Sequence, residues 1–191
     1  MPSAFRLPRL FALVAAALLA FACSPAAAAV SITFYSKELG SSFPHAFFIL
    51  EGAPERGGAR VDEDYGFSAK TVSPAILWGK VKGEVISNHS RSYVKGSEKH
   101  FSLTLTDAEY DRVMETVGRW RSAPQPSYDL DRHNCVHFVA DVAASIGLKT
   151  DTGRLMKKPT AFLRSLTKAN RPFLEARGAL LYQEPKQAAA G

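Results

Sequence analysis

Residues 128–139 read YDLDRHNCVHFV, a polar lead-in followed by an apolar segment that contains Cys135. Beyond Asn134 the apolar residues recur with the spacing of one helix face, at Val136, Val139, Val142, Ala143 and Ile146. This spacing predicts a helix that begins at or close to Cys135. The free backbone N–H groups and the positive dipole end of a helix start favour a thiolate, so Cys135 is a candidate nucleophile. The alternative is a small buried hydrophobe, as free cysteines often are.

The first thirty residues are typical of a secretory leader. Arg6 and Arg9 precede an apolar run from Leu10 to Ala22, and the small residues Ser24 to Ala29 follow it. The run is too short to favour a membrane span. We therefore expect residues 1–29 to be a signal peptide cleaved after Ala29, which leaves one domain's length of chain and predicts a periplasmic or secreted protein.

The two cysteines lie on either side of that cleavage point, so cleavage would remove Cys23 and leave Cys135. Cys23 raises the alternative of a lipoprotein, although the bulky Phe21 stands where a small residue is normally required. If the leader is removed, Cys135 is the only thiol and no intramolecular disulfide can form in an oxidising compartment. An exported protein with one unpaired cysteine either buries that residue or uses it.

The charge balance is basic, with a formal net charge of +6 and a pI near 9.4. The lysines and arginines are spread along the chain instead of forming one block. This distribution suits an anionic partner, such as a cell wall or a lipid-derived substrate, and it is equally typical of a solvated basic surface. No nucleic-acid-binding motif is present, so we expect no nucleic acid, and we expect a monomer.

Strand patterns dominate the first half of the mature chain. β-branched and aromatic runs predict five strands, and their bounds are Val30–Tyr35, Ala46–Leu50, Arg60–Ala69, Val81–Ser87 and Lys99–Leu105. Between them, Val72–Gly79 is expected to be a short helical turn or a covering loop, and Asn88–Ser97 a loop or irregular crossing.

Helical patterns dominate the second half. Thr106 and Glu109 have the spacing of a capping box, and the helix that they open should end before Pro124. Gly147 closes the Cys135 helix, and Pro159 opens a last one through Lys168. Residues 173–191 are expected to be a C-terminal extension whose apolar part docks on the body and whose end is loose. This order predicts an α+β domain with a mostly antiparallel sheet packed against helices.

A nucleophilic cysteine needs a base, and five histidines are available. His137 lies about 200° around the helix from Cys135 and faces away from it, while His133 belongs to the lead-in loop. His89 and His100 are expected to be surface residues. His45 opens an apolar strand, so it is rigidly placed and is the best candidate base, with an incidental strand-edge histidine as the alternative.

Metal binding by His133, Cys135 and His137 is a further possibility. Three ligands so close together cannot easily surround one ion on a regular helix, and a structural zinc site requires four ligands. We therefore expect no metal and no cofactor.

The pattern Tyr128-x-Leu-x-x-x-Asn134-Cys135-x-His137-Phe138-Val139 resembles a known nucleophile motif. That known motif is found in the circularly permuted NlpC/P60, or lecithin:retinol acyltransferase-like, branch of the papain-like cysteine enzymes, where it reads Asn-Cys-Glu-His-Phe. That branch carries its catalytic histidine earlier, on a strand that the segment from His45 to Gly52 resembles. The resemblance covers these two segments residue by residue, and most of the mature chain in element order.

The resemblance implies a papain-like catalytic domain over residues 30–172, with Cys135 as nucleophile and His45 as base. Val136 departs from the family's glutamate. Ser68 falls nearest the position of the third catalytic residue, and Asp64 or Tyr65 are alternatives that could orient His45. We place the oxyanion at the backbone N–H groups of the helix start, with Asn134 and Tyr128 beside it.

Together these features predict an exported cysteine peptidase or amidase that acts through a thioester, with peptidoglycan peptides as its substrate. Two alternatives remain. One is a lipid acyltransferase or a thioesterase-like enzyme, as the acyltransferase branch implies. The other is a non-enzymatic cell-envelope binding protein on the same fold.

Overall fold

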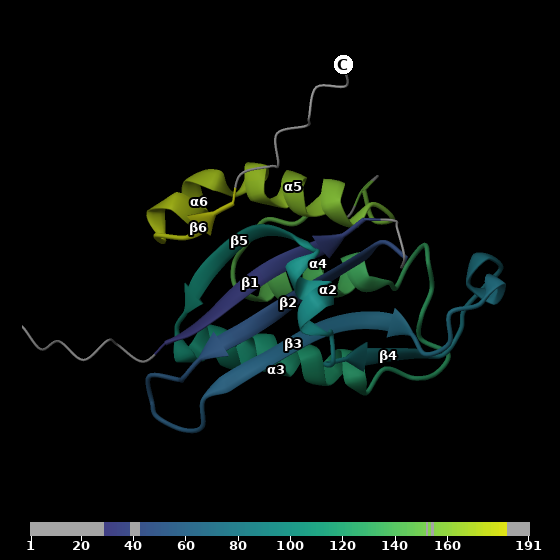
Figure 1. Ribbon diagram of the computed structural model, residues 1–191, viewed down its shortest axis with the longest axis horizontal. Coiled ribbons are helices and arrows are strands. Elements are labelled where there is room, and N and C mark those ends of the chain that lie inside the picture. The colour runs from purple at the N-terminus through teal and green to yellow at the C-terminus, as the bar shows by residue number, and fades with distance from the viewer. Residues whose placement is uncertain (1–28, 39–42, 152, 154, 183–191) are drawn as a thin grey trace, which may run out of the picture.

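The computed structural model describes residues 29–38, 43–151, 153 and 155–182. They form a six-stranded antiparallel sheet in the order β4-β3-β2-β1-β5-β6 (Figure 1). The strands are β1 (Val30–Lys37), β2 (His45–Gly52), β3 (Val61–Ala69), β4 (Gly83–Ile86), β5 (Glu98–Leu105) and β6 (Leu180–Leu181). The predicted α+β class with an antiparallel sheet is therefore confirmed.

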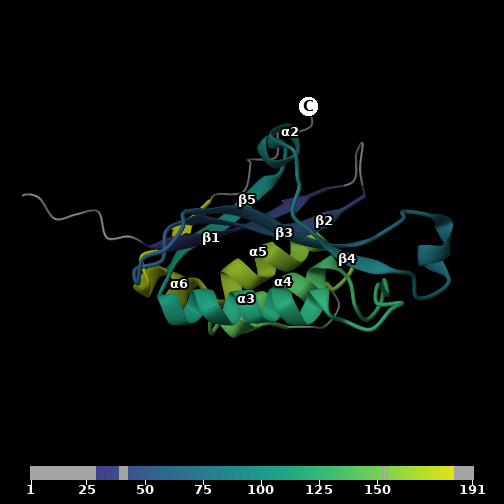
Figure 2. The ribbon, with the colours of Figure 1, turned by 90° about the horizontal axis from the view of Figure 1, so that it is seen from below.

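The helices are divided unequally between the two faces of the sheet. One face is covered by α3 (Asp107–Arg121), α4 (Cys135–Ser145), α5 (Pro159–Ala169) and α6 (Arg171–Ala176), whereas the short α2 (Arg91–Lys95) lies on the opposite face (Figure 2). The 3-10 turn η1 (Pro74–Leu77) lies in the connection between β3 and β4. Both faces of the sheet's centre are therefore covered.

The alternation of side chains along β2 explains this double covering. Phe48 and Leu50 point into the main core with the residues of α4, while Phe47 points to the other face, where it stacks on Tyr35 with ring centroids 5.1 Å apart. A strand with apolar residues on both faces is stable only between two layers. The continuous apolar run predicted this burial.

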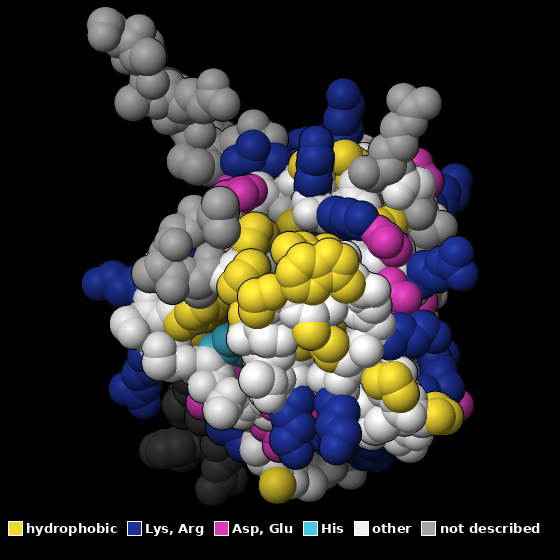
Figure 3. Space-filling model, turned by 90° about the vertical axis from the view of Figure 1, so that its right-hand side faces the viewer, with side chains coloured by type: hydrophobic (Ala, Val, Ile, Leu, Met, Phe, Trp, Pro, Cys, Tyr) yellow, Lys and Arg dark blue, Asp and Glu magenta, His cyan; other side chains and the backbone are white. Residues whose placement is uncertain are grey.

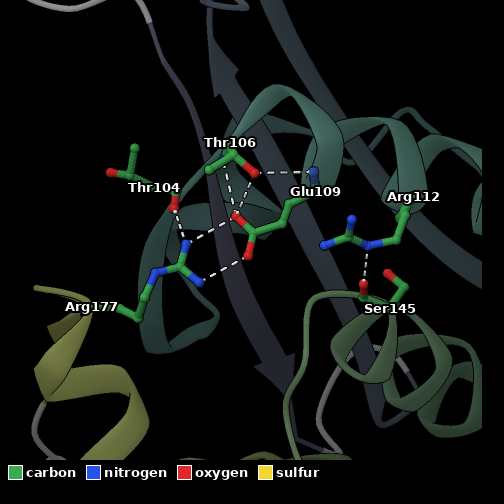
Figure 4. Close-up of polar contacts among 6 residues, drawn as sticks. All are labelled: Thr104, Thr106, Glu109, Arg112, Ser145 and Arg177. Atoms are coloured by element: carbon green, nitrogen blue, oxygen red, sulfur yellow. Dashed lines mark hydrogen bonds and ion pairs between the residues drawn. The ribbon is translucent and has the colours of Figure 1, made fainter.

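The start of α3 carries the predicted capping box. The Thr106 hydroxyl accepts the N–H of Glu109 at 3.3 Å, and the Glu109 carboxylate accepts the N–H of Thr106 at 2.9 Å. Arg177, just beyond α6, donates two further hydrogen bonds of 2.9 Å to this carboxylate (Figure 4). Burial works against the charged carboxylate, but these donors outweigh it and lower the pKa of Glu109. This contact fastens the C-terminal segment to α3.

Two parts of the chain differ from the sequence-based expectations. The segment expected to be a loop or crossing, Asn88–Ser97, contains α2, whose first turn is capped by the Ser90 hydroxyl. Five residues are too few for a helical period to show in the sequence. Beyond Pro172 the chain docks on the body as expected, and it also adds β6 as a sixth strand against Phe101 and Ser102 of β5.

The expected leader, Cys23 and the expected loose end after Tyr182 lie outside the described residues. Within the described ranges, no helix has the length and apolar character that crossing a membrane requires.

Candidate functional site

Cys135 is the first residue of α4, as its sequence context predicts. Asn134 is the N-cap, and its side-chain oxygen accepts the N–H of Val136 at 2.8 Å and that of His137 at 3.3 Å. The Asn134 amide nitrogen donates to the carbonyls of Leu130 and Met156 at 2.7 and 2.9 Å. Since both amide hydrogens are used, Asn134 fixes the helix start and the loop before it, and has none left for a substrate.

The thiol of Cys135 is only 5% exposed, and burial raises its pKa to about 11. The backbone N–H groups of Ala46, Val136 and Cys135 itself act on the sulfur in the opposite direction. The stabilising effect of the helix start is thus present but smaller than the desolvation. Cys135 is a neutral thiol in the resting protein. Its contact with Ala46 also brings the sulfur to the residue that follows His45.

A cavity of about 700 Å³ opens at this end of the sheet. Cys135, His45, Ser68, His89 and Tyr128 line it together with many apolar side chains. Figure 3 views this end of the molecule and shows apolar side chains gathered there, with a histidine visible beside them. The predicted nucleophile and the predicted base therefore face one cavity, although they come from segments ninety residues apart.

His45 reaches the cavity from the α2 face of the sheet. Pairing between β2 and β3 begins only at Phe47 and Gly66, so the two strands separate beside His45. The imidazole stacks on Phe47 with ring centroids 6.1 Å apart. Burial, and then the neighbouring His89, lower its pKa to about 3. His45 Nε2 is buried and has no hydrogen-bond partner among the described residues, so this nitrogen is free to handle a proton.

His89, expected on the surface, is instead a buried neighbour of His45, and that expectation was wrong. Its ring lies 5.4 Å from that of His45 and 4.5 Å from that of Phe47, and its side chain is 6% exposed. Asp64 Oδ2 contacts His89 Nδ1 and also accepts the backbone N–H of His89 at 3.2 Å. Asp64 therefore orients His89, where the sequence had offered it as a partner of His45.

The remaining candidates occupy different surroundings. Ser68 lines the cavity on the same strand as Asp64. Tyr65 points to the helix face, packs on Phe48 and donates its hydroxyl to Glu63, so it is not placed to orient His45. Tyr128 lines the cavity, and both its burial and the charge of an ionised Cys135 raise the pKa of its phenol.

The other three histidines serve the fold. His133 stacks on Trp120 with ring centroids 3.8 Å apart and hydrogen-bonds the carbonyl of Ser127 at 2.7 Å. His137 completes the capping box with Asn134. His100, expected on the surface, is 3% exposed and bonds Ser36, so that expectation was wrong as well. Among the residues that the structure describes, no three His, Cys, Asp or Glu side chains are grouped closely enough to hold a metal.

Sequence reasoning missed His89 of this candidate site and its contact with Asp64, which the sequence suggests only as a possible partner of His45. The two residues are 25 positions apart, and no local spacing in the sequence indicates their contact. Gly66 was also missed. A side chain there would collide with the His45 ring. A glycine inside a strand indicates that some group approaches the backbone closely, but it does not indicate which group.

No protein family model, no curated protein and no solved structure matches this chain.

Proposed function

We propose that the protein is an exported cysteine hydrolase that acts through a thioester, with Cys135 as nucleophile and His45 as base. The observation that carries this proposal is the shared cavity. A thiol at a helix start and the imidazole of His45 line it from two different elements, and the buried Nε2 of His45 has no hydrogen-bond partner among the described residues. Acyl transfer requires a base that can reach the proton of the nucleophile. No hydrogen bond joins Cys135 and His45 in this structure, so the proposed reaction requires a side-chain rotation that brings the two groups together.

The chemistry starts from a neutral pair, because burial disfavours both the thiolate and the imidazolium. His45 takes the Cys135 proton as the sulfur attacks an amide or ester carbonyl, and then gives this proton to the leaving group. The backbone N–H of Cys135 at the helix start faces the developing oxyanion, with the Tyr128 phenol on the same cavity wall. Water then attacks the thioester as His45 removes its proton. The C–S bond breaks, the carboxylic acid leaves, and His45 returns the proton to the Cys135 sulfur.

The contact between Asp64 and His89 takes the place assigned to a third catalytic residue. Asp64 holds the His89 ring beside His45 and so fixes the surroundings in which His45 takes and gives its proton. Ser68, the position nearest by motif, remains a cavity-lining residue that is available to a substrate.

The proposed fold is a circularly permuted papain-like domain. The element order supports it, since the histidine strand β2 precedes the cysteine helix α4 and that helix packs on the sheet beside it. The same order supports a single catalytic domain that follows the leader.

The cavity walls favour a substrate with an apolar acyl group. Apolar residues from several segments form most of the lining, among them Val72, Ile76, Leu77, Ile86, Leu130 and Met156. Acyl chains are stabilised in such a site by removal from water. The second candidate substrate is a peptidoglycan peptide, which the excess of lysine and arginine over aspartate and glutamate favours because the cell wall is anionic.

The non-enzymatic reading also has one observation in its favour. A cysteine with a raised pKa and 5% exposure has the environment of an inert structural thiol. A direct assay with matched variants separates these two readings.

The test compares the purified protein with Cys135→Ala, His45→Gln and, as a control, His133→Gln, whose ring packs away from the cavity. Substrates are acyl esters and amides of two to twelve carbons, and soluble muropeptides. We expect hydrolysis that increases with chain length, an acyl adduct on Cys135 by mass spectrometry, and a loss of roughly 100-fold or more in both site variants. Equal turnover by the Cys135→Ala variant, or no turnover of any substrate, would reject the enzyme. Faster turnover of muropeptides would select the peptide substrate.

A further inference from the structure

The connection between β3 and β4, residues 70–82, projects from the end of the sheet as an apolar lobe. Val72, Leu77 and Trp78 are 55%, 69% and 80% exposed, and they account for half of the large exposed hydrophobic residues in the part of the chain that the structure describes. In Figure 3 apolar side chains gather over this end of the molecule. Water-exposed apolar side chains in a contiguous group mark a contact surface more often than a free one.

The lobe has a fixed base. The N–H of Lys70 donates to the carbonyl of Lys82 at 2.8 Å, and Val81 exchanges two hydrogen bonds of 2.9 Å with Tyr128. The η1 turn then closes with bonds of 3.1 Å to the carbonyls of Ser73 and Ala75. Hydrogen-bonded backbone therefore holds the apolar side chains in place, so little conformational entropy is lost when the lobe binds a partner.

The charge of the lobe has one sign. Lys70, Lys80 and Lys82 are exposed at its base, and the sequence has no aspartate or glutamate from residue 65 to residue 83. Lysines beside exposed Trp and Leu suit the surface of an anionic bilayer. The ammonium groups can contact lipid phosphates in the headgroup region while the apolar side chains enter the boundary of the acyl chains.

We propose that this lobe docks on the surface of an anionic phospholipid bilayer. A second copy of the chain fits less well, because a symmetric contact through the lobe would bring the lysines of both copies together. Phe43, 66% exposed, and Leu77 both border the cavity, so docking turns the cavity mouth toward the membrane. The inference does not depend on the proposed enzyme, and Cys135→Ala should dock as the wild type does.

Tryptophan fluorescence provides a local test. The chain has two tryptophans, and Trp120 is only 6% exposed in the core, so Trp78 is the residue that a bilayer can reach. The protein is mixed with vesicles of phosphatidylcholine alone or with about a third phosphatidylglycerol, and with the same lipids brominated on the acyl chains. We expect a blue shift and bromolipid quenching with anionic vesicles, and neither in a Trp78→Phe variant.

Cosedimentation with the same vesicles measures the affinity. We expect Leu77→Ser to lower the partition coefficient by roughly tenfold or more. The triple variant Lys70→Glu, Lys80→Glu, Lys82→Glu should lower it by a similar factor. Leu180→Ser is the matched control for the first, since Leu180 is 64% exposed on β6, and Lys168→Glu is the control for the charge change. All variants share residues 1–29, so differences between them report on the lobe. Circular dichroism checks that each variant is folded.

Three results would overturn the proposal. The first is a Trp78 emission that no vesicle changes, and the second is equal vesicle binding by the lobe variants and their controls. The third is a blue shift without vesicles that grows with protein concentration and accompanies a dimer in analytical ultracentrifugation, which would make the partner a second copy of the chain.

Discussion

The imidazole ring of His45 on β2 occupies the space that a side chain at Gly66 on β3 would fill. A Cβ atom at position 66 would collide with His45 Nε2, and it would also lie 3.1 Å from His89 Cε1 and 3.2 Å from His45 Cε1. The proposed base is thus held where it is because β3 carries a glycine at this place. The strand gives up packing area there, and the imidazole occupies the space.

Replacing Gly66 by alanine should therefore displace His45. We expect an overpacking cost of about 1–3 kcal/mol in chemical denaturation and a loss of at least about tenfold in hydrolysis, because a misplaced base transfers protons poorly. Gly118→Ala is the control. No atom lies within 4 Å of a Cβ at position 118 in α3, so it should raise stability by about 0.5–1 kcal/mol and leave turnover unchanged. Full activity in the Gly66→Ala variant would remove His45 from the mechanism.

Asp64 and Asp62 lie two positions apart on β3, so Asp62 provides a control for a substitution at Asp64. Asp64 contacts His89, whereas Asp62 is exposed. We expect Asp64→Asn to lower kcat/KM by roughly 10-fold to 100-fold and to change its pH profile, because His89, which lowers the pKa of His45, is no longer held in place. Asp62→Asn should leave both unchanged. If the two variants behave alike, the contact between Asp64 and His89 has only a structural role.

The raised pKa of Cys135 predicts slow alkylation. At pH 7.5 the thiolate population is far smaller than that of an ordinary thiol, so iodoacetamide should react with the folded protein more slowly than with glutathione. The rate should rise with pH up to about 11, the pKa of the thiol. Mass spectrometry of the alkylated peptide measures it. A fast reaction that is already independent of pH at 7 would mean that the sulfur is a resting thiolate.

The fold was largely predictable because its signals are local. The capping box at Thr106 and Glu109, the apolar period after Asn134 and the apolar run of β2 each span only a few residues, and each formed the predicted element. What escaped prediction is short or non-local. The helix α2 has five residues, and β6 has two residues that are ordered by their pairing with β5.

The surroundings of the candidate site were predictable only in part, for the same reason. Cys135 and His45 are conspicuous because each stands at the start of a strongly patterned element. His89 stands in a polar segment whose composition indicates exposure, yet Phe47, Tyr93 and Asp64 bury it. Burial set by tertiary contacts also reversed the expected effect of the helix start on the Cys135 pKa, since a spacing pattern contains no information on desolvation.

Arg177 should stabilise the whole domain through Glu109. Arg177→Ala leaves a carboxylate that is 7% exposed without its cation, and we expect a loss of about 1–3 kcal/mol in the free energy of unfolding. Arg171→Ala is the control, because its pair with Glu175 is exposed and should contribute less than about 0.5 kcal/mol. Urea denaturation measures both. Equal small losses would show that the C-terminal segment is held by its apolar contacts alone.

His100 should make folding sensitive to acid. Its ring is 3% exposed and hydrogen-bonds Ser36 at 2.8 Å, which in turn bonds Thr160 at 2.8 Å. Burial lowers its pKa to about 4; Glu98 opposes this shift and Arg164 adds to it. In the unfolded chain the pKa is near 6.5, so between these values the unfolded state binds the additional proton. The stability contributed by neutral His100 is therefore complete above pH 6.5 and is lost as the pH falls toward 4.

Replacing His100 by glutamine should flatten that dependence. Between pH 6.5 and 4 the wild type should lose on the order of 3 kcal/mol through this residue, while His45, whose pKa is about 3, adds a loss of the same sign. His100→Gln should retain only the part due to the other groups. Thr160→Val is the control, since it removes a hydrogen bond without removing a titrating group, and it should lower stability at every pH while keeping the slope. Unfolding free energies measured by urea at several pH values give both slopes. The same slope in His100→Gln as in the wild type would mean that the ring is protonated in the folded core at no cost.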